Sequence, residues 1–325
     1  MRAIVVESTG GPEQLQLRDL PDPTPAAGEL LVRIHAVTVN HADLMMRAGT
    51  YHTPVALPWV PGLGGAGVVE AVGPGATGFA PGDAVALGMD NSRSYAELAR
   101  VPASMAVRIP KGAGFPEASS IPINGLTAAW CVRRLAQVAA GEHVLILGGS
   151  GGVGHIAVQL ARAAGAHVIA TASPAKRDWL RSLGAQHVID HDPKTLPARV
   201  KELTSGRGVE VSIDGIGGPS FAAALRSLAY GGRCVALANA TLEDTVMNTR
   251  DFYPKNATIL GFQIRQRMAH GWDFRPDSSE LLGLVAAGAL QVHVGRRHAL
   301  AEAPQAHHAI DARAATGHVV LEPQR

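Results

Sequence analysis

Residues 143–165 read HVLILGGSGGVGHIAVQLARAAG, and this stretch decides the fold. Residues 143–149 form a short apolar run that predicts a buried strand. Residues 152–165 predict a helix, because apolar side chains recur there at i, i+3 and i+4 spacing and Gly165 can end it. A glycine-rich turn joins the predicted strand to the predicted helix.

This turn matches the G-x-G-x-x-G pattern of dinucleotide-binding sites. The match is formed by Gly149, Ser150, Gly151, Gly152, Val153 and Gly154. In such a turn the first glycine permits a tight bend, the second lets the backbone approach a pyrophosphate, and the third lets the helix pack on the strand. The pyrophosphate then lies at the positive N-terminus of the helix. The alternative is a glycine-rich turn without a ligand, and the flanking strand and helix favour the dinucleotide site.

The end of the next predicted strand (167–172) indicates which dinucleotide is bound. A site for NAD places Asp or Glu about twenty residues after the glycines, where it binds the ribose 2′-hydroxyl. Here Ser173, Lys176 and Arg177 occupy this region, and no carboxylate precedes Asp178. A hydroxyl and two cations suit a 2′-phosphate, so we expect NADPH. The alternative is that both cations are solvated residues at the start of a helix.

Strands and helices alternate from about residue 125 onward. Further strands are predicted at 187–190, 209–214, 233–238 and 257–262, and a further helix at 175–184. Six short strands with helical connections predict an α/β fold with a doubly wound parallel sheet, the Rossmann arrangement.

The first 120 residues have a different texture. Short strands separated by Gly and Pro are predicted at 3–7, 15–20, 29–39, 65–73 and 82–88. This spacing is typical of a compact β barrel or sandwich. Residues 40–49 predict a short helix that ends at Gly49. Beyond residue 263 we expect one helix at 278–288, followed by strand-like pieces that end at 317–323.

Composition excludes several classes of protein. The length of 325 residues indicates two domains. The apolar content of 46% excludes global disorder. The net charge of +2 argues against a nucleic-acid-coating protein. Two cysteines, Cys131 and Cys234, exclude a disulfide scaffold and a four-thiolate zinc lobe and favour the reducing cytoplasm. We expect no membrane association, because every apolar run is too short to span a bilayer and the N-terminus does not read as a signal peptide.

Several segments together resemble the zinc-independent quinone oxidoreductase branch of the medium-chain dehydrogenase/reductase superfamily. They are MRAIVVESTGGPEQLQLRDLPDP (1–23), GELLVRIHAVTVNHADLMMRAGTY (28–51), PGLGGAGVVEAVGPGATGFAPGDAV (61–85), INGLTAAW (123–130) and HVGRRHALAEAPQAHHAIDARAATGHVVLEP (293–323). The resemblance implies a discontinuous GroES-like β-barrel catalytic domain over 1–123 and 265–325, and a Rossmann NADPH-binding domain over 124–264. It also implies an active site in the interdomain cleft and a homodimer.

The zinc ligands of related enzymes are missing from this sequence. Zinc members of the superfamily carry Cys near the position of Asn40 and a His-Glu pair in a P-G-H-E-x-x-G segment. Here that segment is Pro61–Gly67, PGLGGAG, without either residue. We therefore expect no catalytic metal. Quinones and α,β-unsaturated carbonyl compounds suit a metal-free site, because the charge that follows hydride addition delocalises onto a distant oxygen.

The resemblance also implies two catalytic candidates. Asn40 is similar to an Asn beside the nicotinamide, where its amide would bond substrate or cofactor. The alternative is an N-cap for the helix that follows. Tyr51 falls where related enoyl reductases carry a Tyr proposed as proton donor. The alternative for Tyr51 is a buried aromatic residue with a satisfied hydroxyl.

Further cofactor contacts follow from the same resemblance. Thr127 corresponds to a position near the nicotinamide ribose or phosphates, or is a helix-start hydroxyl. Ala238 and Asn239 match a strand end that approaches the nicotinamide amide. His191 stands where quinone oxidoreductases often have a Tyr that helps hold the adenosine phosphate end.

Two other functions remain open. An enoyl-thioester reductase of fatty-acid or polyketide metabolism would need a basic patch, for which Arg93, Arg265 and Arg267 are candidates. A non-catalytic NADPH-binding protein, like the lens crystallins of this family, would fit an intact glycine turn equally well. Turnover of substrate distinguishes them.

Overall fold

A computed structural model describes residues 1–88 and 93–325. Contacts between residues divide the chain into two compact units. Unit 1 comprises Met1–Leu126 and Met268–Arg325, and unit 2 comprises Thr127–Arg267. Unit 2 carries the glycine-rich turn.

Unit 2 is built on a six-stranded sheet in the order β10-β9-β8-β11-β12-β13, and every neighbouring pair is parallel. The strands are β8 (His143–Ile146), β9 (His167–Thr171), β10 (His187–Ile189), β11 (Val209–Asp214), β12 (Leu228–Ala236) and β13 (Thr258–Gly261). This order confirms the doubly wound Rossmann sheet, with its change of direction between β8 and β11. The predicted start of β12 at residue 233 was wrong, because pairing with β11 already begins at Leu228.

Helices connect these parallel strands. They are α4 (Gly152–Ala163), α5 (Arg177–Ser182), α6 (Leu196–Leu203) and α7 (Pro219–Arg226). Gly165 adopts a left-handed conformation with φ of 82° just after α4, as expected of a residue that ends a helix. The helices α6 and α7 pack on one another, and their apolar side chains share one buried core with those of the sheet, which includes Leu145, Ile169, Val200 and Leu225.

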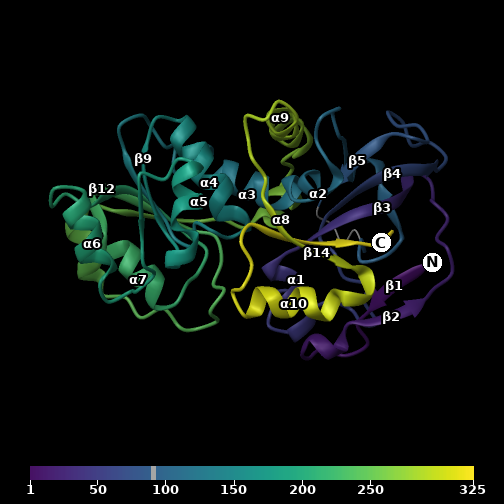
Figure 1. Cartoon of the computed structure of the whole chain (residues 1–325), viewed down its shortest axis with the longest axis horizontal. Coiled ribbons are helices and arrows are strands. Elements are labelled where there is room, and N and C mark those ends of the chain that lie inside the picture. The colour runs from purple at the N-terminus through teal and green to yellow at the C-terminus, as the bar shows by residue number, and fades with distance from the viewer. Residues whose placement is uncertain (89–92) are drawn as a thin grey trace. The chain divides into compact units, whose positions relative to one another are not determined.

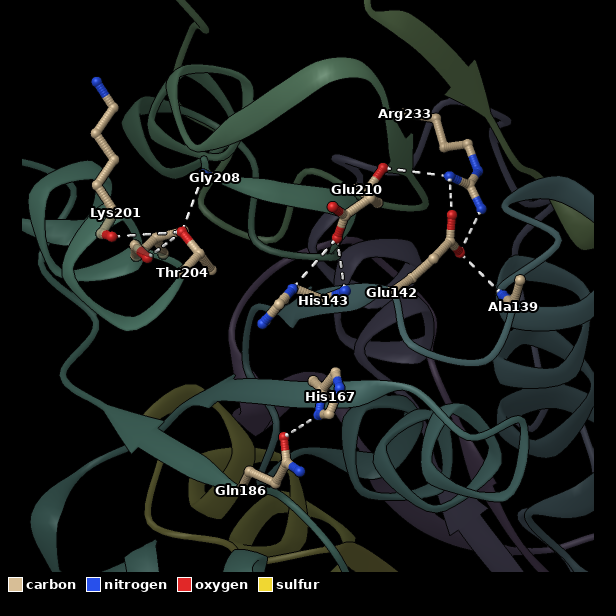
Figure 2. A network of polar contacts seen from close by, with 11 residues as sticks. Ala139, Glu142, His143, His167, Gln186, Lys201, Thr204, Gly208, Glu210 and Arg233 are labelled. Carbon is tan, nitrogen blue, oxygen red and sulfur yellow. Dashed lines mark hydrogen bonds and ion pairs between the residues drawn. The ribbon is translucent and has the colours of Figure 1, made fainter. Parts of the chain in front are cut away.

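A polar network joins the amino ends of β8 and β11 to Arg233 of β12 in unit 2 (Figure 2). The Arg233 guanidinium donates from Nη1 and Nη2 to the two carboxylate oxygens of Glu142, at 2.8 and 2.7 Å, and from Nη2 to the carbonyl of Gln137. The Glu210 carboxylate accepts the His143 backbone N–H at 2.6 Å. We call Arg233, Glu142, His143 and Glu210 the Arg233 clamp. Two-pronged pairing of Arg with a carboxylate is both strong and geometrically specific.

Unit 1 is a mainly antiparallel β structure. Its strands are β1 (Arg2–Val5), β2 (Gln16–Asp19), β3 (Glu29–Val39), β4 (Gly65–Val72), β5 (Ala84–Leu87), β6 (Leu98–Pro102), β7 (Ala106–Arg108), β14 (Val294–Ala299) and β15 (His318–Glu322). The main sheet has the order β14-β15-β3-β4-β5-β7, and β6 pairs with β3. The C-terminal strand β15 thus pairs with β3, whereas the N-terminal strand β1 pairs with β2 in a separate two-stranded sheet (Figure 1). This is the GroES-like barrel that the sequence predicts.

The helices of unit 1 cover this sheet. They are α1 (His41–Ala48), α2 (Phe115–Ala118), α9 (Arg275–Ala286) and α10 (Ala303–Asp311). The expectation of only strand-like pieces after residue 288 was wrong, because α10 forms there and buries Ala303, Ala306 and Ala309. In the described part of the chain, no helix combines the length and apolar character needed to cross a bilayer.

One continuous helical run passes from unit 1 into unit 2. It consists of η3 (Ile121–Gly125), α3 (Leu126–Ala129) and η4 (Trp130–Leu135). A second helix, α8 (Ile264–Ala269), contains the return to unit 1. The remaining short helices are η1 (Pro12–Gln14), η2 (Ala103–Met105), η5 (Pro174–Lys176), η6 (Thr249–Asp251), η7 (Tyr253–Lys255) and η8 (Leu300–Glu302).

Candidate functional site

The glycine turn leaves the carboxyl end of β8 and enters α4. Gly148 is the residue with a left-handed backbone, at φ of 65°. The tight bend that we expected at Gly149 therefore lies one residue earlier, at Gly148. The backbone N–H of Gly149 instead donates to the Thr171 carbonyl at 3.0 Å, and that of Gly148 donates to Thr171 Oγ1 at 3.0 Å. The turn is thus fastened to the last residue of β9.

The three glycines of the motif differ in the space around them. A Cβ on Gly154 would lie 2.2 Å from the Gly148 carbonyl oxygen, so only glycine lets α4 pack this closely on the turn. A Cβ on Gly149 would lie 2.8 Å from Ala170 Cβ. At Gly151, the N-cap of α4, the nearest atom is the Gly148 oxygen at 3.3 Å, and nothing else lies within 4 Å. The backbone at Gly151 is therefore open to a ligand, as a pyrophosphate site requires.

The other residues of the motif complete the turn and the start of the helix. Ser150 lies in the turn and is partly exposed. Gly152 and Val153 form the first positions of α4 and are also partly exposed. The free N–H groups of a helix start favour an anion. In α4 the side chain of His155 approaches the Gly151 carbonyl, with Nδ1 at 2.8 Å, and so holds the turn against the first helical turn.

The predicted 2′-phosphate residues follow β9 directly. Ser173 is the exposed N-cap of the short helix η5, and Lys176 is its last residue. Partial burial lowers the pKa of the Lys176 ammonium from its ordinary value. Arg177 forms an ion pair with Asp190, 2.7 Å from Nη2 to Oδ1. The structure thus brings Ser173 and Lys176 to one helical turn, whereas the Arg177 guanidinium already has a carboxylate partner.

His191 follows β10 and is engaged on both sides of its ring. Its Nδ1 lies 3.3 Å from Thr171 Oγ1, and its Nε2 lies 2.9 Å from Ser220 Oγ. Ser220 is the second residue of α7. Sequence reasoning did not single out Thr171 or Ser220, because neither lies in the glycine motif.

The carboxyl ends of β11 and β12 bring Ala238 and Asn239 beside a second glycine turn. Both residues are exposed, and the Asn239 side chain donates from Nδ2 to the Glu243 carbonyl at 3.0 Å. A Cβ on Gly217 would lie 2.2 Å from Asn239 Oδ1, so the two loops are in close contact. The buried Asp214 carboxylate accepts the N–H groups of Ile216 and Gly217 at 2.9 and 3.0 Å.

Asp214 is a supporting residue that sequence reasoning missed. Its signal was present, because an Asp at the end of a buried strand directly before glycines is typical of a turn held by a carboxylate. Burial raises the pKa of Asp214, and the two backbone hydrogen bonds lower it. Thr127, by contrast, lies in the middle of the helical run and is 7% exposed. A helix-start role therefore does not describe Thr127.

Asn40 occupies the N-cap position of α1 in unit 1. Its side chain donates from Nδ2 to the Thr38 carbonyl at 3.0 Å. Within the described chain, the Asn40 Oδ1 atom is buried and has no hydrogen-bond partner. The Asp43 carboxylate accepts the Asn40 backbone N–H at 2.8 Å. A buried acceptor without a donor is costly, so Asn40 offers a ligand a ready hydrogen-bond acceptor.

Asp43 is a second residue that the sequence analysis passed over. It is fully buried, and burial raises the pKa of its carboxyl to about 7, although hydrogen bonds from Asn40, Gly62 and Leu63 oppose the rise. The Asn40–Asp43 spacing, with an acid three residues after an N-cap, was the available signal. Gly62 and Leu63 belong to the segment in which zinc-containing relatives carry their ligands, so Asp43 connects that segment to Asn40.

Tyr51 lies just beyond the other end of α1. Its N–H donates to the Met45 carbonyl at 3.2 Å, and its ring centroid is 4.1 Å from that of His52. The eight residues of α1 span roughly 12 Å, so the two catalytic candidates lie about one helix length apart. Tyr51 is partly exposed, which does not fit the alternative of a buried aromatic residue.

The described residues form neither a metal site nor the expected basic patch within one unit. Among residues 1–88 and 93–325, no three His, Cys, Asp or Glu side chains are grouped to hold a metal ion. The three arginines proposed for a thioester site do not share a unit, because Arg93 belongs to unit 1 and the other two to unit 2. Arg267 stacks on the Trp130 ring, with Cζ 4.9 Å from its centroid.

Comparison with known proteins gives matches over both units. Residues 26–111 match the alcohol dehydrogenase GroES-like domain, and residues 152–287 match the zinc-binding dehydrogenase family. A quinone oxidoreductase of Pseudomonas aeruginosa is 34% identical over 316 residues, 97% of each chain. A 2-haloacrylate reductase of a Burkholderia species is 32% identical and covers 99% of each chain. A mycobacterial protein solved with NADPH is 36% identical with a TM-score of 0.92, covering 99% of this chain and 100% of its own.

Proposed function

Since this chain belongs to the quinone oxidoreductase branch of the medium-chain dehydrogenase/reductase superfamily, we propose that it is an NADPH-dependent reductase. Its substrates are quinones or α,β-unsaturated carbonyl compounds, reduced without a metal. The observation that carries the proposal is the free space beside the backbone of Gly151, which lies at the switch point of the sheet. Its neighbours Gly149 and Gly154 have no such space, because other atoms crowd them. The full-length similarity to a quinone oxidoreductase and to a haloacrylate reductase supports both substrate classes.

NADPH fits unit 2, where the turn 148–154 receives the pyrophosphate and Ser173 and Lys176 receive the 2′-phosphate. When bound, NADPH supplies the hydride. The chain positions the dinucleotide by holding the turn on Thr171 and by holding the neighbouring loop on Asp214. We assign the contacts of Thr127, Ala238 and Asn239 to the nicotinamide half, by their correspondence to family positions.

In unit 1 we assign substrate or cofactor binding to Asn40 and proton donation to Tyr51. The unpartnered Oδ1 of Asn40 accepts a hydrogen bond, and Asp43 keeps the Asn40 backbone in place. A phenol has an ordinary pKa near 10 and can donate a proton to an enolate that forms beside it. The catalytic domain then comprises residues 1–123 and 265–325, and the NADPH-binding domain residues 124–264.

We also propose a homodimer and a cytoplasmic location. The strand β13 forms an edge of the parallel sheet and exposes Ile259, and such an edge is a template for pairing with a second copy. Both cysteines are buried free thiols, which suits a reducing compartment. Light scattering of the wild type and of Ile259→Lys tests the dimer, which the charged edge should dissociate.

The test of the function is steady-state oxidation of NADPH, and then of NADH, with 1,4-benzoquinone and a short enone. Turnover with preference for NADPH is the expected result. Turnover with NADH alone would keep the enzyme class and refute the role of Ser173, Lys176 and Arg177. If NADPH binds and neither substrate turns over, the thioester reductase and the non-catalytic binding protein remain, and an enoyl thioester distinguishes these two.

A further inference from the structure

The His191 ring joins structural elements that are distant in sequence. Its partner Thr171 ends β9, and its partner Ser220 opens the helix after β11. The Thr171 hydroxyl also accepts the N–H of Gly148, the left-handed residue of the glycine turn. A single chain of hydrogen bonds therefore runs from the glycine turn through Thr171 and His191 to the start of α7.

Each ring nitrogen of His191 has a hydroxyl partner in this chain of hydrogen bonds. A neutral imidazole has one donor and one acceptor nitrogen, and each hydroxyl can donate or accept. If the Thr171 hydroxyl donates to His191 Nδ1, then Nε2–H donates to Ser220 Oγ, and the opposite direction works equally well. Thr171 and Ser220 are 1% and 3% exposed, so neither has water as an easy substitute partner.

A direct contact between His191 and a phosphate would break this arrangement. One ring nitrogen would have to leave a buried hydroxyl in order to donate to the phosphate. The start of the glycine turn also packs against the loop before α7, because Gly148 faces Ile216, whose Cδ1 would lie 3.5 Å from an added Cβ. The two loops that the chain joins are thus neighbours at the switch point, where a dinucleotide binds.

We propose that His191 is a positioning residue that holds the glycine turn and the start of α7 in the arrangement that receives the dinucleotide, without touching its 2′-phosphate. This inference rests on the proposed NADPH site and adds a role for one residue of that site. The proposed role of His191 differs from that of Lys176, because only Lys176 distinguishes NADPH from NADH. The loss of His191 should weaken both dinucleotides alike, whereas the loss of Lys176 should weaken NADPH alone.

The experiment compares His191→Phe with wild type by measuring the Kd of NADPH and of NADH through quenching of tryptophan fluorescence. Phe keeps a ring and removes both hydrogen bonds, so we expect both Kd values to rise by about tenfold or more, since the loss of even one hydrogen bond can cost about a factor of ten. Their ratio should stay constant. In His191→Gln, which can donate and accept, part of the affinity should return. The matched control is His187→Phe, an exposed histidine on β10, which should leave both Kd values unchanged.

A readout without dinucleotide completes the test. Hydrogen exchange of residues 147–151 in the free protein should be faster in His191→Phe, because the acceptor of the Gly148 amide loses its own anchor. If His191→Phe does not fold, Ser220→Ala breaks the same chain at its other end and should give the same pattern.

The proposal is overturned if the Kd of NADPH rises and that of NADH does not, since His191 would then contact the 2′-phosphate. It is equally overturned if neither Kd nor the exchange rate changes. Failure of the wild type to bind either dinucleotide is a different result, because it refutes the proposed cofactor site itself.

Discussion

The carboxylate of Asp43 accepts the backbone N–H of Asn40 at 2.8 Å, and both residues are buried at the start of α1. Among the residues that the structure describes, none donates to Asn40 Oδ1, and Asp43 fixes the backbone that carries this atom. Because Asp43 is cut off from water, its protonation state affects the stability of unit 1.

Asp43 should make stability depend on pH. Burial raises the pKa of Asp43 to about 7 in the folded chain, from an ordinary 3.8. The folded state therefore binds more protons than the unfolded state between these pH values. The contribution of protonated Asp43 to the free energy of unfolding is complete below about pH 4 and is lost as the pH rises to about 7. The loss is on the order of 4 kcal/mol. Urea unfolding at a series of pH values should show this decline in wild type and a flatter profile in Asp43→Asn. Asp178→Asn, at a carboxylate that is 97% exposed, should keep the wild-type profile, and an identical decline in Asp43→Asn would contradict the assignment.

Alanine substitutions at two glycines of the turn should have different effects on stability and on NADPH binding. In Gly154→Ala the new Cβ meets the Gly148 oxygen at 2.2 Å, so unfolding of the free protein should become easier by roughly 1–3 kcal/mol. In Gly151→Ala the Cβ meets one atom at 3.3 Å, a much milder crowding, so the loss of stability should be smaller than in Gly154→Ala while NADPH binds at least about tenfold more weakly. Thermal unfolding and NADPH titration of both variants provide the check. Equal losses of stability would show that Gly151 is not an open position.

Lys176 and Arg177 should contribute unequally to the choice of dinucleotide. Lys176→Ala should raise the Kd of NADPH by about tenfold or more and leave that of NADH unchanged, since only NADPH has the 2′-phosphate. Arg177→Ala should have a smaller effect, because Arg177 is already paired with Asp190 at 2.7 Å. Titration of both variants with both dinucleotides measures the difference. A larger effect at Arg177 would mean that the Asp190 pair opens when NADPH binds.

Tyr51 is predicted to act on the substrate and not on the cofactor. Tyr51→Phe should lower kcat with an enone by about 100-fold, a typical contribution of a general acid, with the Kd of NADPH unaltered. Stopped-flow measurement of NADPH oxidation separates this step from product release. Unchanged activity with every quinone and enone would rule out proton donation by Tyr51.

Elements with strong local patterns could be predicted from the sequence. Residues 29–39 and 209–214 form strands with the predicted bounds, because apolar and β-branched residues recur along both segments, as is typical of strands. The strand β14 falls among the strand-like pieces expected after residue 288, but its bounds could not be predicted, because Gly295, Arg296 and Arg297 make its sequence polar and its strand character comes from pairing with β15. The helix α7 was not singled out either, since its first turn begins with Pro219 and Ser220 after two glycines.

The same distinction applies to the candidate site. The glycine motif is local, so its position was readable, although the left-handed residue is Gly148 and not Gly149. The role of His191 was not readable, because its partners Thr171 and Ser220 lie 20 and 29 residues away and meet it only through the crossovers of the sheet. Asp43 and Asp214 each had a local sequence signal, an acid three residues after an N-cap and an acid directly before glycines, but the sequence could not show that both carboxylates are fully buried.

The Arg233 clamp joins the amino ends of β8 and β11 to β12, whereas the residues that we propose to face the dinucleotide follow the carboxyl ends of the strands. A protein engineer who wishes to exchange the coenzyme can therefore redesign the loop after β9 without weakening the interactions that fix the opposite edge. Libraries that vary Ser173, Lys176 and Arg177 should retain a high fraction of folded members. Libraries that vary Glu142 and Arg233 should lose folded members first and inform us little about the coenzyme.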